Sequence, residues 1–111
     1  MNKVIITGRT GQNPEFGKMK SEKSYANFSV AITESYKDKN TGEWVNLTDW
    51  VSCSSFGNTA DYINKYIQKG DRVSIVGKLK QSSWDDKEGN KRSTLQLIVE
   101  HIEKWDWEKS P

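Results

Sequence analysis

The residues whose types and spacing indicate a chemistry lie between Thr48 and Phe56. Read as a β-strand, in which side chains alternate between two faces, this segment places Val51 and Cys53 on a face suited to a core. The opposite face combines large rings with hydroxyl groups: Trp50, Ser52, Ser54 and Phe56. Exposed rings are unfavourable unless a flat apolar partner covers them, and unpaired nucleic-acid bases are such partners. A second core or an oligomer interface would use the same rings, and this segment alone leaves both readings open.

The composition limits the other classes of function. At 111 residues the chain predicts a single domain, and 17 Lys plus Arg against 15 Asp plus Glu permit a polyanionic partner without requiring one. The mean hydropathy of −0.86 predicts a small core inside much polar surface. The single Cys53 and the single His101 exclude an internal disulfide framework and a structural zinc site. Without a signal-peptide pattern or an apolar run long enough to span a membrane, we expect a cytoplasmic protein without membrane association.

Strand patterns dominate the chain and position the rings. The clearest alternation places Ala26, Phe28, Val30 and Ile32 inward, and polar loops are predicted over 34–43 and 85–92. Later strands are expected to turn Leu79 and Leu95 inward, among other apolar residues. The predicted strands are Lys3 to Gly8, Ser24 to Thr33, Trp44 to Phe56, Val73 to Leu79, and Ser93 to about Ile102.

One helix is predicted between the third and fourth strands. An apolar stripe with intervals of four, three and four residues joins Phe56, Ala60, Ile63 and Ile67. We expect Asn58 or Thr59 to cap its start and Gly70 to follow its end.

Five strands with this single helix predict an all-β fold with one helix, the OB-fold, a five-stranded partly open Greek-key barrel with long β-hairpin loops. Its binding face lies over the second and third strands and over the loops that join strands one to two and four to five. We assign this domain to residues 1–104 and a short C-terminal extension to residues 105–111.

Short segments along nearly the whole chain occur in an order typical of one family. They are Asn2-Lys3-Val4-Ile5 with Gly8, Gly11 to Glu15, Ala26 to Ala31, Ser35 to Lys39 with Thr41-Gly42-Glu43, Thr48-Asp49-Trp50 with Phe56-Gly57, Tyr66-Ile67 with Lys69-Gly70-Asp71, Val76 to Leu79, and Trp84-Asp85 with Gly89. No single segment is specific, but together they resemble the bacterial single-stranded DNA-binding proteins, the SSB family. The resemblance covers almost all of the chain.

The resemblance implies which side chains contact DNA. Rings at the positions of Trp50, Phe56 and Trp84 stack on bases in that family, and the position of Tyr36 usually holds a Trp with the same role. Stacking is worth about 1–3 kcal/mol per base and tolerates every base, which accounts for binding without sequence preference. The lysines expected to neutralise phosphates are Lys37 and Lys39 on the first hairpin, Lys78 and Lys80 on the outer face of the fourth strand, and Lys69 at the helix exit.

Several of these positions have a simpler explanation. Trp84 would also pack against its own hairpin, and Trp44 would equally cover a barrel end. Cationic and anionic residues alternate in both polar loops, as in an ordinary solvated hairpin, so only some of the lysines are expected to touch phosphate. Cys53 is interpreted as a small buried apolar residue.

The chain also departs from the family pattern. Ser82 and Ser83 precede Trp84 where basic residues are frequent, and Asn58 stands where Lys is common. Fewer cations release fewer phosphate counterions, so we expect weaker binding and a shallower salt dependence than in typical members. Those members continue into a long Gly/Gln/Pro-rich tail with an acidic end. This sequence ends at Trp105–Pro111 instead. The chain is therefore expected to be either a compact phage- or plasmid-type member of the family or a shortened form of a longer one.

We expect a binding protein without catalysis or cofactor. No phosphate-binding loop, nucleophile elbow or inward carboxylate pair occurs in the sequence. The expected partner is single-stranded DNA, with RNA also possible, during replication, recombination or repair, and the resemblance implies a homotetramer or homodimer. Contacts with replication and repair proteins stay open. The alternative is an OB-fold protein-interaction module of a primosome-like assembly with weak or no DNA binding.

Overall fold

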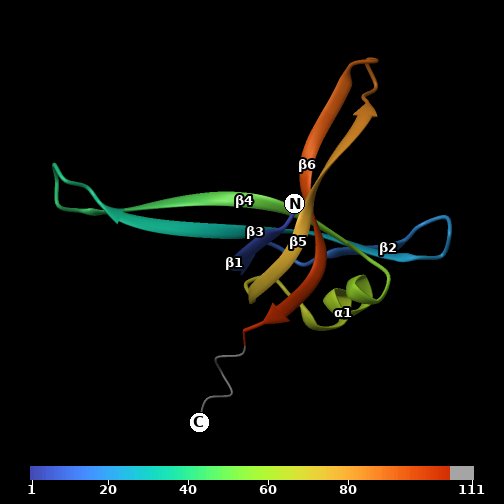
Figure 1. Ribbon diagram of the computed structural model, residues 1–111, viewed down its shortest axis with the longest axis horizontal. Helices are drawn as coiled ribbons and strands as arrows, with labels where there is room; N and C mark the ends of the chain where they lie inside the picture. The colour runs from blue at the N-terminus through green and yellow to red at the C-terminus, as the bar shows by residue number, and fades with distance from the viewer. Residues whose placement is uncertain (106–111) are drawn as a thin grey trace, which may run out of the picture.

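The computed structural model describes residues 1–105 as six strands and one helix (Figure 1). Five strands form the barrel and one short strand is added at its edge. The elements in chain order are β1 (Val4–Thr10), β2 (Glu15–Lys18), β3 (Ser24–Lys37), β4 (Trp44–Phe56), α1 (Asn58–Tyr66), β5 (Arg72–Asp85) and β6 (Lys91–Lys104).

The strand order β1-β5-β6-β4-β3, with β3 returning to β1, closes the barrel. Two seams of this ring are short. β3 meets β1 only at Arg9 and Thr10, and β4 meets β6 in a parallel pairing at Cys53 and Ser54. The remaining pairings are long and antiparallel. This topology confirms the predicted OB-fold, to which β2 is added as a short strand paired with the beginning of β3.

Alternating side chains of the barrel strands and one face of α1 form the core. Cys53 is buried as predicted, and burial raises the pKa of its thiol to about 12, so it stays protonated near neutrality. The helix closes one end of the barrel. The buried core residues are Ala26, Phe28, Val30, Cys53, Ala60, Ile63, Ile67, Val73, Ile75, Leu97, Val99 and Ile102.

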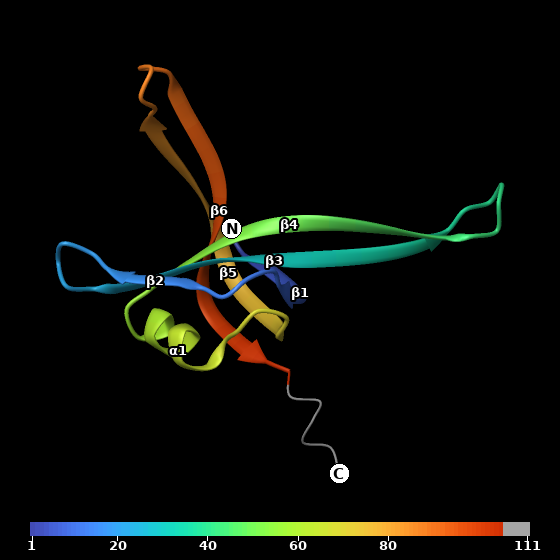
Figure 2. The ribbon, with the colours of Figure 1, turned by 180° about the vertical axis from the view of Figure 1, so that it is seen from behind.

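Two long hairpins leave the barrel in different directions (Figures 1 and 2). The polar loops predicted over 34–43 and 85–92 were too long, because β3 continues to Lys37 and β5 continues to Asp85. Polar cross-strand contacts hold the β3–β4 hairpin together beyond the barrel. Thr33 and Thr48 share a hydrogen bond of 3.1 Å, and the Ser35 hydroxyl donates to Asn46 Oδ1 at 2.6 Å.

Leu79 and Leu95 were predicted to face the core, and this was wrong. They are 40% and 59% exposed. The alternation of β5 and β6 continues through them, but Leu79, the partner of the buried Leu97, lies at the rim of the barrel, and Leu95 lies in the part of the hairpin that has left it. A period-two pattern predicts which face a side chain lies on, and only the length of the barrel decides whether anything covers that face.

The helix boundaries also differ from the prediction. Gly57 occupies the N-cap position, and no side chain caps α1, although Asn58 or Thr59 was expected to do so. The helix ends at Tyr66, and Gly70 lies farther on, in the turn before β5. No helix within residues 1–105 is long and apolar enough to cross a membrane. Apart from Trp105, the predicted C-terminal extension lies outside the described residues.

Candidate functional site

The outward face of β4 carries three exposed rings at equal intervals. β4 pairs with β3 in an unbroken register from Phe56 to Trp44, so Trp44, Trp50 and Phe56 share one face. Neighbouring rings are six residues apart, which is about 20 Å along a strand. Trp44 is 71% exposed and Trp50 is 63% exposed. We call Trp44, Trp50 and Phe56 the ring face; the sequence had left Trp44 open.

A close approach to Gly11 positions Trp50. A Cβ atom at Gly11 would overlap Cζ3 of the indole and lie 2.8 Å from Cη2, so the ring rests directly on the glycine backbone. The Gly11 amide donates to the Ser29 carbonyl at 3.0 Å, which fixes this part of the chain against β3. The segment between β1 and β2 therefore positions the Trp50 indole by packing against it, although most of the ring stays exposed.

A polar hollow of about 200 Å³ lies between Trp50 and Phe56. Amide and hydroxyl groups in its wall could hydrogen-bond to the edges of bases stacked on the neighbouring rings. Its lining residues are Gln12, Glu15, Asn27, Phe28, Ser29, Ser52, Cys53 and Gln96.

Tyr25 lies beside Phe56 on the same face and was missed as a site residue. The two residues are cross-strand partners in the β3–β4 register. A Cβ atom at Gly17 would lie 2.5 Å from the Tyr25 hydroxyl oxygen, so this half-buried ring is packed on β2. The sequence had placed Tyr25 outward, but it contains no signal that pairs Tyr25 with Phe56.

Tyr36 lies on the opposite face of the β3–β4 hairpin from the ring face. It pairs with Val45 and follows the alternation that buries Phe28 and Val30 farther down β3. Outside the barrel this alternation leaves the ring 49% exposed. A single nucleic-acid strand that contacts both Tyr36 and Trp50 must therefore pass around the edge of the hairpin.

Trp84 stands on the second hairpin, where two predicted lysines share its face. Strand alternation on β5 puts Lys78, Lys80 and Trp84 on one side, and all three side chains are exposed. Trp84 pairs with Arg92, whose Nε donates to Asp86 Oδ2 at 2.9 Å. This hydrogen bond, followed by the Asn90 backbone amide, lowers the pKa of Asp86 below its usual 3.8.

The other predicted lysines lie apart. Lys37 is exposed opposite Trp44 in the register, so it belongs to the same face as the rings. Lys39 is exposed in the turn beyond it. The backbone amide of Lys69 donates to Asn13 Oδ1 at 2.9 Å, which ties the segment after α1 to the chain between β1 and β2.

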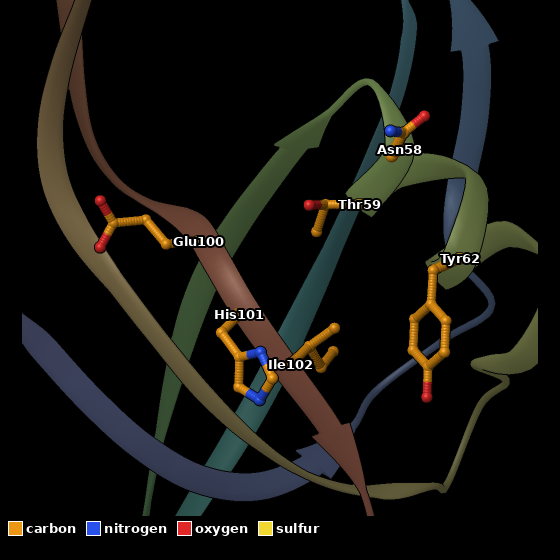
Figure 3. A pocket seen from close by; sticks show the side chains of 6 residues that line it. All are labelled: Asn58, Thr59, Tyr62, Glu100, His101 and Ile102. Carbon is orange, nitrogen blue, oxygen red and sulfur yellow. The ribbon is translucent and has the colours of Figure 1, made fainter.

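A larger hollow of about 430 Å³ lies between α1 and β6 (Figure 3). Tyr62 and His101 supply its two rings, and Glu100 accepts a hydrogen bond from Lys3 Nζ at 2.7 Å. Its lining residues are Asn58, Thr59, Tyr62, Glu100, His101 and Ile102. Nowhere in residues 1–105 do three or more potential metal ligands gather.

Comparisons with known proteins agree with this geometry. A model of the single-strand binding protein family matches residues 1–105. A solved structure described as Plasmodium falciparum SSB complex with ssDNA is 29% identical in sequence, with a TM-score of 0.85. The alignment covers 96% of this chain and 96% of that one.

Proposed function

The chain belongs to the single-strand binding protein family and binds single-stranded DNA, and we propose that its exposed rings are the binding platform. In this proposal Trp50, Phe56, Tyr36 and Trp84 stack on bases, and Trp44 extends the ring face toward the hairpin tip. Phosphate contacts come from Lys37, Lys39, Lys78, Lys80 and Lys69. The observation that carries the proposal is the alignment of three exposed rings along β4, with a polar hollow between two of them.

Binding without sequence preference follows from this arrangement. A ring stacks on any base, but only when that base is unpaired. The protein therefore traps melted DNA and shifts the duplex equilibrium toward single strands. We propose that it coats single strands during replication, recombination or repair in the cytoplasm, that it needs neither catalysis nor a cofactor, and that RNA is a possible second ligand.

We further propose that the chain assembles as a homotetramer or homodimer. β1 pairs with β3 only at Arg9 and Thr10, so most of one β1 edge has no strand partner within residues 1–105. Ile5 is 72% exposed on this strand. An unpaired edge with an apolar side chain is suited to pairing with a second copy. Light scattering of the wild type and of Ile5→Glu tests this, and a monomeric wild type would contradict it.

The proposal is tested by titrating the protein with oligo-dT while following its own tryptophan fluorescence. We expect strong quenching that weakens as salt rises, since both stacking and counterion release contribute. Duplex DNA of the same length is the control and should quench little. Binding of oligo-dT that is unchanged by substitution of Trp50 and Trp84 would instead favour a different surface. Absence of binding at low salt would favour the protein-interaction alternative.

A further inference from the structure

Two arginines lie side by side where the barrel closes. Arg9 on β1 pairs directly with Arg72 on β5, so both side chains are on the same face of the sheet. Like charges directly opposite each other destabilise an antiparallel pair unless an anion lies between them. None of the ion pairs found within residues 1–105 includes either arginine.

Local contacts hold both guanidinium groups in place. Arg9 Nη1 donates to the Gly70 carbonyl at 3.1 Å, and the Arg72 guanidinium lies 5.3 Å from the centre of the Trp105 ring. Arg72 Nε is buried and has no hydrogen-bond acceptor among the described residues. A buried donor without an acceptor is unfavourable, so an anion that brings an acceptor to this guanidinium would be stabilising.

A hollow of about 180 Å³ lies at this pair. The wall combines two guanidinium groups, whose planar donors match phosphate oxygens, with hydroxyl groups that can also donate. The lining residues are Thr7, Gly8, Arg9, Ala31, Thr33 and Arg72.

The hollow is in line with the central ring of the ring face. Arg9 pairs with Ala31, and Ala31 pairs with Trp50, so one row crosses the sheet from the arginines to the indole. Two strand spacings separate Arg9 from Trp50, which is about 10 Å between backbones. Ala31 is small, so no long side chain stands between them in this row.

We propose that Arg9 and Arg72 form a phosphodiester-binding site for the DNA strand whose base stacks on Trp50. The inference rests on the proposed function and adds to it two residues that were absent from the predicted phosphate contacts. Their positions far apart in the sequence explain why the pair was missed.

The test measures oligo-dT affinity across a salt series for the wild type, Arg9→Gln, Arg72→Gln and the double variant. Each lost phosphate contact in single-stranded DNA should reduce the slope of log K against log salt by about 0.7 in magnitude, and the double variant by about 1.4. Lys65→Gln on α1 is the matched control, because it removes one charge outside the site and should leave the slope unchanged. Circular dichroism confirms folding, and Arg9→Gln carries the test alone if Arg72→Gln fails to fold.

A second readout separates the possible outcomes. The ¹⁵N–¹H signal of Arg72 Nε should shift on addition of oligo-dT and much less on addition of inorganic phosphate at the same concentration. Failure of the wild type to bind oligo-dT would contradict the proposed function itself. Tight binding with an unchanged slope in the double variant would overturn only the arginine site, and a shift with inorganic phosphate alone would show a site for free anions.

Discussion

The two long hairpins have similar architecture, but their side chains differ in net charge and in the number of aromatic rings. Residues 34–49 of the β3–β4 hairpin include two cationic and four anionic side chains, together with Tyr36 and Trp44. Residues 78–92 of the β5–β6 hairpin include five cationic and three anionic side chains and a single ring, Trp84. Stacking needs flat apolar surface and counterion release needs positive charge. From this difference we expect the first hairpin mainly to bind bases and the second mainly to bind phosphates.

The largest effect is expected from Trp50→Ala. Losing one stacked base costs about 1–3 kcal/mol, which weakens binding about 5- to 150-fold. Trp84→Ala should cost less, because its hairpin relies more on charge. Fluorescence anisotropy with labelled oligo-dT measures both, and Tyr62→Ala on α1 is a control for the loss of an exposed ring. A larger loss for Trp84→Ala than for Trp50→Ala would reverse the proposed division of roles.

The contact between Trp50 and Gly11 can be tested without removing the indole. Gly11→Ala places a methyl group where the Trp50 ring lies, so the ring must move while the fold is kept. We expect a smaller loss of oligo-dT affinity than for Trp50→Ala and little change in melting temperature. Gly42→Ala, at a φ of +73° in the turn at the tip of the β3–β4 hairpin, strains the backbone without touching Trp50, so it controls for destabilisation that leaves the indole in place. Equal affinities for the wild type and Gly11→Ala would show that the position of the indole is not critical.

The charge of the second hairpin should appear in the salt dependence. Lys80→Gln should reduce the slope of log K against log salt by about 0.7 in magnitude if this lysine contacts a phosphate. Arg92→Gln should change it less, because Asp86 already neutralises that arginine. A larger change for Arg92→Gln than for Lys80→Gln would show that Arg92 leaves its carboxylate for DNA.

The smallest effect concerns the turn of the β5–β6 hairpin in acid. Because the folded pKa of Asp86 lies below its usual 3.8, its stabilising contribution is complete above that pH and is lost as pH falls through the lowered value. Arg92→Gln removes the main cause and should raise the pKa toward 3.8. An NMR titration of the Asp86 carboxyl carbon measures this. An unchanged pKa in Arg92→Gln would assign the shift to the backbone amides instead.

The sequence predicted the faces of the strands better than their ends. Alternation correctly separated Phe28 and Val30 from the outward side chains, because a strand has a fixed period whatever surrounds it. It misjudged Leu79 and Leu95, since the pattern runs on after the barrel wall has ended. The four residues of β2 show no pattern long enough to detect.

The site was predictable where it depends on one strand. Trp50 and Phe56 followed from the alternation of a single segment, and the family resemblance added Tyr36, Trp84 and the lysines, whose DNA contacts stay predictions. Contacts between strands were not predictable, because they depend on a register that no local pattern records. The packing of Trp50 on Gly11 is the clearest example.

The pairing that closes the barrel joins the first strand to a strand near the end of the chain, and this affects how the protein folds. Val4 pairs with Gly77, so the first strand finds its place only after most of the chain has been made. Such non-local pairing is slow, because the entropy of a long loop is lost before the contacts form. Gly11 follows that strand directly, so closing the barrel also fixes the end of β1 from which the chain continues to the contact with Trp50. A single strand of DNA therefore recognises the finished barrel and, by binding the folded state alone, raises its resistance to unfolding.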